Sequence, residues 1–263
     1  MKYYIPLKAL LLGDQDLLDG VTVMPDDIYK WADENKTTPK TSAPSIEDAI
    51  DLIKPYVDNG DEVIYFSISK EMSTSVNVIN LAVDELEATD KVFVIDSANL
   101  STGVGHLVLE AAIMAKEGMA AKDIVAKIEE LKPRVRASFV VDTLTYLHRG
   151  GRCGSVAALA GGVLKLHPKI VVENGKMSAT KKYRGKMDSV ILSYAKDMEE
   201  DLRNAKTDRV FITHSGCDEE IIQSVYSYLE ELNIFKEIII TRAGSVISSH
   251  CGYGTLGVLF ISK

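Results

Sequence analysis

Four short clusters of hydroxyl and basic side chains have the residue types and spacing to bind an anion. They are Thr41–Ser45, Ser67–Ser75, Arg149–Arg152 and Ser248–Gly254. The first directly precedes a predicted helix, and the second lies between a predicted strand and a predicted helix. Free N–H groups at helix N termini favour an anion, and loops at one edge of an α/β sheet commonly bind ligands. A hydroxyl before a helix can equally be a simple N-cap.

Two of these clusters carry a side chain that could contact a charged head group. His250 lies among small residues and is followed by Gly252 and Gly254, where the backbone could approach a ligand closely. Arg152 could bind a carboxylate or a phosphate bidentately. Both residues could also simply face water, so the residue types alone leave the alternatives open.

Motifs for nucleotide binding and hydrolysis are weak or absent in this sequence. Gly252–Gly257 matches GxGxxG, but the following residues look like a strand, so the βαβ unit behind that motif is not expected. Gly103–Gly105 follows a predicted strand and lacks the third glycine. Neither GxxxxGK[ST] nor GxSxG occurs, so we expect no P-loop and no nucleophile elbow.

Composition narrows the class of protein further. The chain has 263 residues, 46% of them hydrophobic, and a net charge of −8. Without a basic footprint, nucleic-acid binding is not expected. No apolar run approaches the ~18 residues of a membrane span, and a signal peptide is not indicated, so we expect a cytoplasmic protein without stable membrane insertion. Cys153, Cys217 and Cys251 lack metal-ligand spacing, which predicts free thiols and no zinc site.

The elements that must position these clusters alternate along the first part of the chain. Apolar residues from Ile46 to Val57 recur on one helical face, and further helices are predicted over 74–86, 101–118 and 122–131. Strands are predicted over 62–68 and 91–95. Such alternation predicts an α/β domain with a Rossmann-like parallel sheet and helices on both faces.

The second part of the chain has a different pattern. Asn174-Gly175 between two strand-like runs predicts a hairpin. Predicted helices over 186–203 and 219–232 and strands over 209–213, 237–241 and 256–261 follow it. A hairpin among helices indicates a second α/β domain with a mixed sheet. We place the domain boundary near residue 139, which gives domains 1–139 and 140–263 with a ligand between them.

In the same clusters the sequence resembles the DegV family of bacterial fatty-acid-binding proteins. Thr41–Ser45 resembles the family's TSQPS signature, and Arg149–Arg152 resembles its KGGR segment. The likeness runs in order through nearly the whole chain, and its other parts are Ile5–Leu7 with Asp19-Gly20, Ser67–Ser73, Ile95–Ser97 with Gly103–Gly105, Lys165–Pro168, Arg184 and Ser249–Gly254.

The resemblance implies a DegV-like fold and a concrete function. Members bind one long-chain fatty acid, such as palmitate, in a tunnel between two α/β domains, with no metal or cofactor. The carboxylate contacts carry over to Thr41 and Ser73, with His250 near the head group. The family presents the fatty acid to a partner fatty acid kinase, so the protein would be a carrier rather than an enzyme. Arg152 and Arg184 carry over as residues of that presentation step.

The sequence also departs from the family pattern. It begins at the family's second strand, so the usual first strand with its TDSTSDL loop has no counterpart. The SGTY loop reads Ser73-Thr-Ser-Val76, and Thr74 would be strained if that position requires a positive φ. Small residues could leave room for an acyl tail or could serve close helix packing; they are Ala157, Ala158, Ala160, Gly161 and Gly162.

Two other kinds of function remain open at this point. One is an enzyme in its own right: a Ser/His hydrolase built on Ser73 with His250, or a phosphotransferase, since such folds resemble dihydroxyacetone kinase subunits. The other is a degenerate family member that binds nothing and acts only through protein interactions. Burial of a long acyl chain would contribute ~0.8 kcal/mol per methylene, which is consistent with the hypothesis of a fatty-acid carrier.

Overall fold

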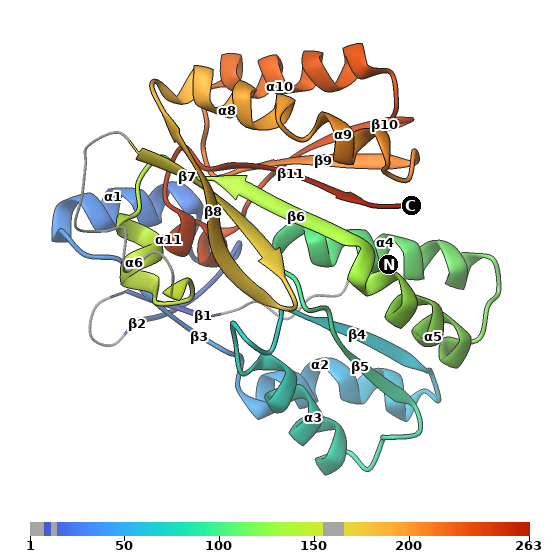
Figure 1. Cartoon of the computed structure of the whole chain (residues 1–263). Coiled ribbons are helices and arrows are strands. Elements are labelled where there is room, and N and C mark those ends of the chain that lie inside the picture. Colours follow the sequence, from blue (N-terminus) through green and yellow to red (C-terminus); the bar gives the residue numbers. More distant parts are fainter. Residues whose placement is uncertain (1–7, 12–14, 155–165) are drawn as a thin grey trace.

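The computed structural model describes residues 8–11, 15–154 and 166–263 (Figure 1). Its strands form three sheets, of which two belong to the N-terminal half and one to the C-terminal half. Ile5–Leu7, Lys165 and the small residues between 157 and 162 lie outside the described residues, so their predicted roles stay predictions.

The first sheet is small and antiparallel, and the sequence pattern did not predict it. It has the order β2-β1-β3, with β1 at Lys8–Leu11, β2 at Gln15–Leu18 and β3 at Lys40–Ser42. Helix α1 (Pro25–Asn35) connects β2 to β3 and packs beside the C-terminal helix α11 (Ser245–Cys251). This sheet therefore connects the start of the chain to its end.

The second sheet confirms the predicted parallel pairing, with two strands. Strand β4 (Val63–Ser67) pairs with β5 (Val92–Asp96). Successive side chains of β4 alternate between two cores. Val63 and Tyr65 pack on one side with helices α2 and α3, and Ile64 and Phe66 pack on the other with α4 and α5. The four helices are α2 (Ile46–Asp58), α3 (Ser75–Glu85), α4 (Ser101–Lys116) and α5 (Ala121–Leu131).

The third sheet is mixed, as predicted, and has the order β10-β9-β11-β6-β7-β8. Among the described strands of this sheet, β9 and β10 pair in parallel and the other neighbours pair antiparallel. The hairpin is confirmed: Asn174 and Gly175 have φ of 50° and 80°, which suits a two-residue type I′ turn. The strands are β6 (Val135–Val140), β7 (Leu166–Glu173), β8 (Lys176–Arg184), β9 (Arg209–His214), β10 (Glu237–Arg242) and β11 (Leu256–Ile261).

Helices cover one face of the mixed sheet, as Figure 1 shows. They are α8 (Met187–Lys196), α9 (Glu199–Arg203) and α10 (Glu219–Leu232). The single helix predicted over 186–203 is wrong. The helix is interrupted at Asp197 and Met198. The Asp197 carboxylate accepts hydrogen bonds from Lys181 and Tyr183 on β8, and the Met198 side chain packs in the core. That tertiary anchoring overrides a helical pattern that is continuous in sequence.

The other face of the mixed sheet looks toward the N-terminal half. It is met there by α4, by α11 and by the short helix α6 (Thr145–Gly150). The 3₁₀ turn η1 (Lys132–Arg134) leads into β6. Residue 139 lies within β6, which pairs with β11 and β7; the domain boundary placed there stays a prediction. In the part of the chain that the structure describes, no helix is long and apolar enough to cross a membrane.

Candidate ligand-binding site

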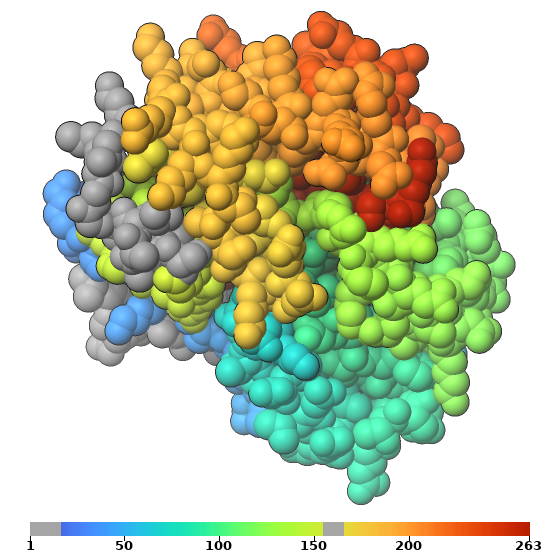
Figure 2. Space-filling view, in the orientation of Figure 1, coloured from blue at the N-terminus to red at the C-terminus, as the bar shows by residue number. Residues whose placement is uncertain are grey.

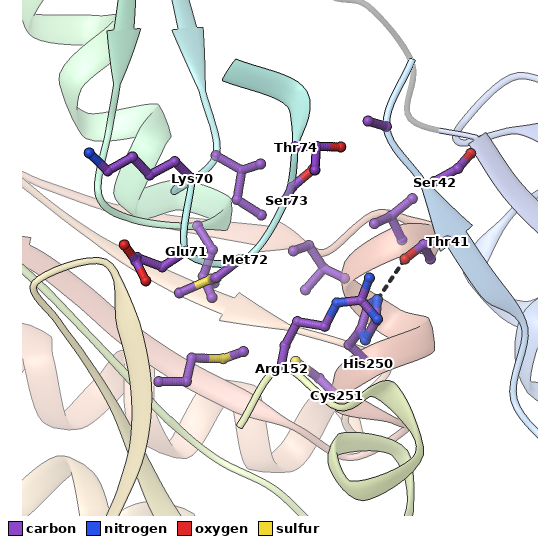
Figure 3. Close-up of a pocket in the computed structure, with 16 residues that line it drawn as sticks. Thr41, Ser42, Lys70, Glu71, Met72, Ser73, Thr74, Arg152, His250 and Cys251 are labelled. Atoms are coloured by element: carbon purple, nitrogen blue, oxygen red, sulfur yellow. Dashed lines mark hydrogen bonds between the residues drawn. The ribbon is translucent and has the colours of Figure 1, made fainter. Parts of the chain in front are cut away.

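A cavity of about 490 Å³ lies where the N-terminal segments meet α11 and the mixed sheet. Its volume falls within the usual range for small-molecule sites, roughly 300–1,000 Å³. Figure 3 shows the side chains that enter it from these separate elements. All four predicted clusters contribute to the lining, and the hairpin strand β8, the N-cap of α4 and the first turns of α11 complete it. The lining residues are Thr41–Ala43, Ile68, Lys70–Thr74, Leu100, Arg152, Met177, Val246, Ile247, His250 and Cys251.

Thr41 and His250 meet at one end of this cavity. The Thr41 Oγ1 and the His250 Nε2 are 2.8 Å apart, although 209 residues separate them in the chain. Thr41 stands on β3 and His250 near the end of α11, so the contact joins the first sheet to the last helix (Figure 3). The N-cap alternative for Thr41 does not hold, because Ser45 caps α2 by accepting from the Asp48 N–H.

The His250 imidazole is neutral at neutral pH. Burial lowers its pKa to about 4, and the positive Arg152 guanidinium acts in the same direction. Its Nδ1 is buried and has no hydrogen-bond partner among the described residues. A Cβ at Gly150 would lie 2.3 Å from that Nδ1. The first glycine of the Arg149–Arg152 cluster therefore leaves the space that the imidazole ring occupies.

Ser73 lines the cavity from a different direction. Its Oγ lies 2.8 Å from the Ser75 Oγ and accepts the Ser75 N–H at 3.2 Å, at the start of α3. Thr74 has φ −79° and ψ 4°. The replacement of the family's glycine by Thr74 therefore introduces no backbone strain, because this position does not require the left-handed region.

The two arginines singled out in the sequence lie far from each other. Arg152 lines the cavity, and its Nη1 donates to the Gly150 carbonyl at 2.6 Å. Arg184 is the exposed last residue of β8, opposite Leu166. It stands seven positions along the strand from the cavity residue Met177, roughly 23 Å at about 3.3 Å per residue. Arg184 is not among the residues that line the cavity.

The rest of the cavity wall is mainly apolar and rests on the mixed sheet. Met72, Leu100 and Met177 belong to one buried cluster with sheet residues such as Phe139 and Ile170. Two of the three are methionines, whose unbranched thioether side chains adapt to irregular shapes. Sequence reasoning missed both methionines, because an isolated Met in a loop or hairpin carries no pattern that places it in a cavity.

The hairpin closes the side of the cavity away from Thr41. The Ser69 Oγ donates to the Gly175 carbonyl at 2.7 Å, and the Lys176 ammonium lies 3.3 Å from the Glu71 carboxylate. A Cβ at Gly175 would lie 2.6 Å from the Ser69 Oγ. Figure 2 shows this contact on the molecular surface, where the hairpin meets the segment that follows β4. The cavity thus has polar side chains at both ends, with Thr41 and His250 at one end and Lys70 and Glu71 at the hairpin end, and a mainly apolar wall between them.

Ser73 and His250 do not contact each other as a nucleophile and its base would. A serine nucleophile needs a base within hydrogen-bond reach, yet the His250 Nε2 contacts Thr41 and the Ser73 Oγ contacts Ser75. Within residues 8–11, 15–154 and 166–263, no group of three or more His, Cys, Asp or Glu side chains is placed to hold a metal ion.

The DegV family, described as uncharacterised proteins, matches residues 3–263. A DegV domain-containing protein of Caldanaerobacter subterraneus subsp. tengcongensis is 30% identical over 263 residues, which are 99% of this chain and 91% of that protein. A fatty-acid-binding DegV family protein from Thermus thermophilus has a TM-score of 0.89 and 29% identity over 98% of this chain and 91% of that one. A stearic acid-binding protein from Eubacterium ventriosum has a TM-score of 0.80 and 26% identity over 98% and 90%. This chain therefore belongs to the DegV family.

Proposed function

We propose that this protein binds one long-chain fatty acid, with the acyl chain along the mainly apolar wall of the cavity and the carboxylate beside Thr41 and His250. The observation that carries the proposal is the Thr41–His250 pair at one end of a cavity that has a mainly apolar wall between its two ends. Solved relatives that share the fold are described as binding fatty acids, in one case stearic acid.

The acyl chain supplies most of the affinity. Each buried methylene contributes about 0.8 kcal/mol, so a palmitate-length chain offers on the order of 10 kcal/mol before the costs of ordering it. Met72 and Met177 provide a wall that adjusts to the tail.

The head group is the costly part, because a buried carboxylate without partners loses several kcal/mol of solvation. We assign the His250 proton to Nε2, since an N–H without an acceptor is the rarer defect in proteins and the Nδ1 has no described partner. The Nε2–H then donates to the Thr41 Oγ1, which frees the Thr41 hydroxyl proton for the carboxylate. Ser73 approaches from the opposite segment as a second hydroxyl donor.

Such a head group is held without a buried ammonium. Neutral donors contribute about 1.5–3 kcal/mol each to a charged acceptor, which retains the carboxylate and leaves its oxygens reactive. We propose further that a partner fatty acid kinase phosphorylates the bound carboxylate, with Arg152 at the cavity and Arg184 on β8 in the presentation step. The resemblance to the family supports this role, and the exposure of both arginines is consistent with it.

Native mass spectrometry of the protein purified from a bacterial host tests the binding proposal. We expect one fatty acid per chain, and rebinding of palmitate or stearate after delipidation. A delipidated protein that takes up no fatty acid of any length contradicts the proposal.

A pair of variants separates ligand binding from simple stability. Thr41→Ala should lower fatty-acid affinity by at least tenfold. Ser45→Ala, in the same cluster, removes only the cap of α2; it should cost about 1 kcal/mol of stability and leave affinity unchanged. Equal affinity losses in the two variants would contradict the assignment of Thr41.

The kinase role needs its own assay. A fatty acid kinase with ATP should form acyl phosphate faster from protein-bound than from free fatty acid. Arg152→Ala should slow that transfer while the dissociation constant for the fatty acid stays the same. Transfer at equal rates from free and bound fatty acid would contradict the carrier role and leave the binding proposal intact.

A further inference from the structure

We infer that Asp19 is the positioning residue of this site: its carboxylate caps the N terminus of α11 and so holds His250 against Thr41. The predicted effect on ligand affinity rests on the proposed function, whereas the predicted effect on the His250 imidazole does not.

Asp19 reaches α11 from the opposite end of the chain. Its Oδ1 accepts the Ser245 N–H at 2.6 Å, and its Oδ2 accepts the Val246 N–H at 3.0 Å. The first N–H groups of a helix have no partner inside the helix, and a carboxylate there also complements the helix dipole. One side chain thus satisfies two of these donors from 226 residues away.

The start of α11 is built to receive this carboxylate. The N-cap position is Gly244, which provides no side-chain cap. A Cβ at Gly244 would lie 2.7 Å from the Asp19 Oδ2 and 3.0 Å from the Oδ1. A side chain at this position would collide with Asp19. Glycine therefore supplies no cap of its own and leaves the space in which the Asp19 carboxylate caps the helix.

The other contacts of this junction hold Asp19 and α11 in the same register. The Ser245 Oγ donates to the Val23 carbonyl at 2.9 Å, and Asp19 itself forms a backbone bridge with Val23. The turn that carries Asp19 is therefore fixed to the helix by side chains from both partners.

The first sheet connects Asp19 to Thr41 through its three paired strands. Asp19 directly follows β2, and Ala9 on β1 pairs with Leu17 on β2 and with Thr41 on β3. Leu17 and Thr41 thus stand two strands apart, roughly 10 Å. On the other side, His250 lies five residues after the capped Ser245 in the same short helix. The Asp19 cap is therefore the link that sets β3 and α11 against each other at the 2.8 Å contact.

Asp26 provides a matched control. Its carboxylate also comes from the N-terminal half of the chain and contacts the C-terminal half. It pairs with Arg242 at the end of β10 rather than with α11, and its side chain is 72% exposed. Asp26→Ala breaks a contact across 216 residues, against 226 for Asp19 and Ser245, without touching the cap of the His250 helix.

The first readout is the His250 imidazole in the ligand-free protein. Its ¹⁵N signals are identified by their loss in His250→Gln. Asp19→Ala should shift the Nε2 signal, because the contact to Thr41 is displaced, and Asp26→Ala should leave it in place. An unshifted Nε2 signal in Asp19→Ala overturns the inference whatever the ligand is. Asp19→Asn keeps one acceptor and should give a smaller shift, which serves if Asp19→Ala does not fold.

The second readout compares palmitate with the alcohol of the same chain length. Asp19→Ala should weaken palmitate binding about fivefold to tenfold, part of the loss expected for a hydrogen bond to a charged acceptor, because the displaced imidazole no longer orients the Thr41 hydroxyl. Alcohol binding should change less than twofold. In a His250→Ala background the same substitution should have no further effect. An equal loss for acid and alcohol, or a full loss in that background, overturns the inference, because Asp19 would then act on general stability.

Discussion

Two histidines in this protein resemble each other in several respects, although His106 is fully buried and His250 only partly so. Burial lowers the pKa of both His106 and His250 to about 4. Each also has a buried Nδ1 for which the described part of the chain offers no partner. Yet the His106 Nε2 donates to the Leu259 carbonyl at 3.0 Å and its ring meets the edge of Phe211, inside the interface between α4 and the mixed sheet.

The difference shows which observation identifies a site. A displaced pKa marks functional and structural residues alike. His250 differs from His106 because it borders a cavity and because its partner is a hydroxyl with a second hydrogen-bonding direction. A backbone carbonyl such as that of Leu259 only accepts, so His106 has no proton to pass toward a ligand. We therefore propose that His106 serves folding and that His250 serves binding.

The largest expected effect is that of His106→Ala on the stability of the protein. His106→Ala removes a fully buried ring and should lower the free energy of unfolding by about 3 kcal/mol, by analogy with other large-to-small core substitutions. Fatty-acid affinity should stay within twofold. Chemical denaturation and a displacement titration measure the two quantities. A stable His106→Ala protein with weakened binding would remove the distinction.

The converse substitution should act on binding. His250→Ala removes the group that orients the Thr41 hydroxyl, and the affinity for palmitate should fall about tenfold to a hundredfold, the value of a hydrogen bond to a charged acceptor. Affinity for the uncharged alcohol of equal length should change little. Titration of both ligands against both variants gives the comparison, and an equal loss for acid and alcohol would contradict it.

Acid should destabilise the ligand-free protein through both histidines. Because each folded-state pKa of about 4 lies below the ordinary value of 6.5, the unfolded chain binds the proton first as the pH falls. Stability is therefore full above about pH 6.5 and is progressively lost down to about pH 4, by up to about 3 kcal/mol for each group. Denaturation curves across this window should flatten in His106→Gln and in His250→Gln. An unchanged pH profile in either variant would contradict the burial of that imidazole.

The bound ligand should change only one of these titrations. A carboxylate beside His250 favours the imidazolium and raises its pKa. Binding should therefore take up a fraction of a proton at pH values just above the ligand-free pKa of about 4 and tighten as the pH falls towards it. Calorimetry in two buffers of different ionisation enthalpy measures the uptake. It should disappear in His250→Gln and persist in His106→Gln. Uptake that survives in His250→Gln would place the carboxylate elsewhere.

The smallest expected effect concerns the space beside the His250 ring. Gly150→Ala would place a Cβ 2.3 Å from the Nδ1, whereas the same change at Gly154 meets no atom of the described residues within 4 Å. The ring can rotate away, so we expect about a fivefold loss of fatty-acid affinity, the low end of overpacking costs of ~1 kcal/mol, and none in Gly154→Ala. Equal affinities in both variants would mean that the ring position does not matter for binding.

The sequence could predict the elements whose pattern is local. Apolar periodicity located α2 and α10, and Asn174-Gly175 located the hairpin, because a helix face or a two-residue turn is determined by neighbouring residues. The break at Asp197 and the small sheet of β1, β2 and β3 were not predicted, since each depends on contacts from distant segments.

The candidate site shows the same limit more sharply. Residue types marked Thr41 and His250 as candidates, and the family resemblance linked them, but nothing local predicts that residues 209 positions apart make a hydrogen bond. The role of Asp19 could likewise not be predicted, because an Asp-Gly pair is typical of an ordinary turn. Its function depends on a helix at the other end of the chain.

Palmitate labelled with ¹³C at its carboxyl carbon can show whether the carboxylate binds beside Thr41 and His250. We expect one bound resonance at a carboxylate position that shifts in Thr41→Ala and in His250→Gln and stays in place in His106→Gln. A bound resonance that none of the three substitutions moves would mean that the carboxylate lies elsewhere.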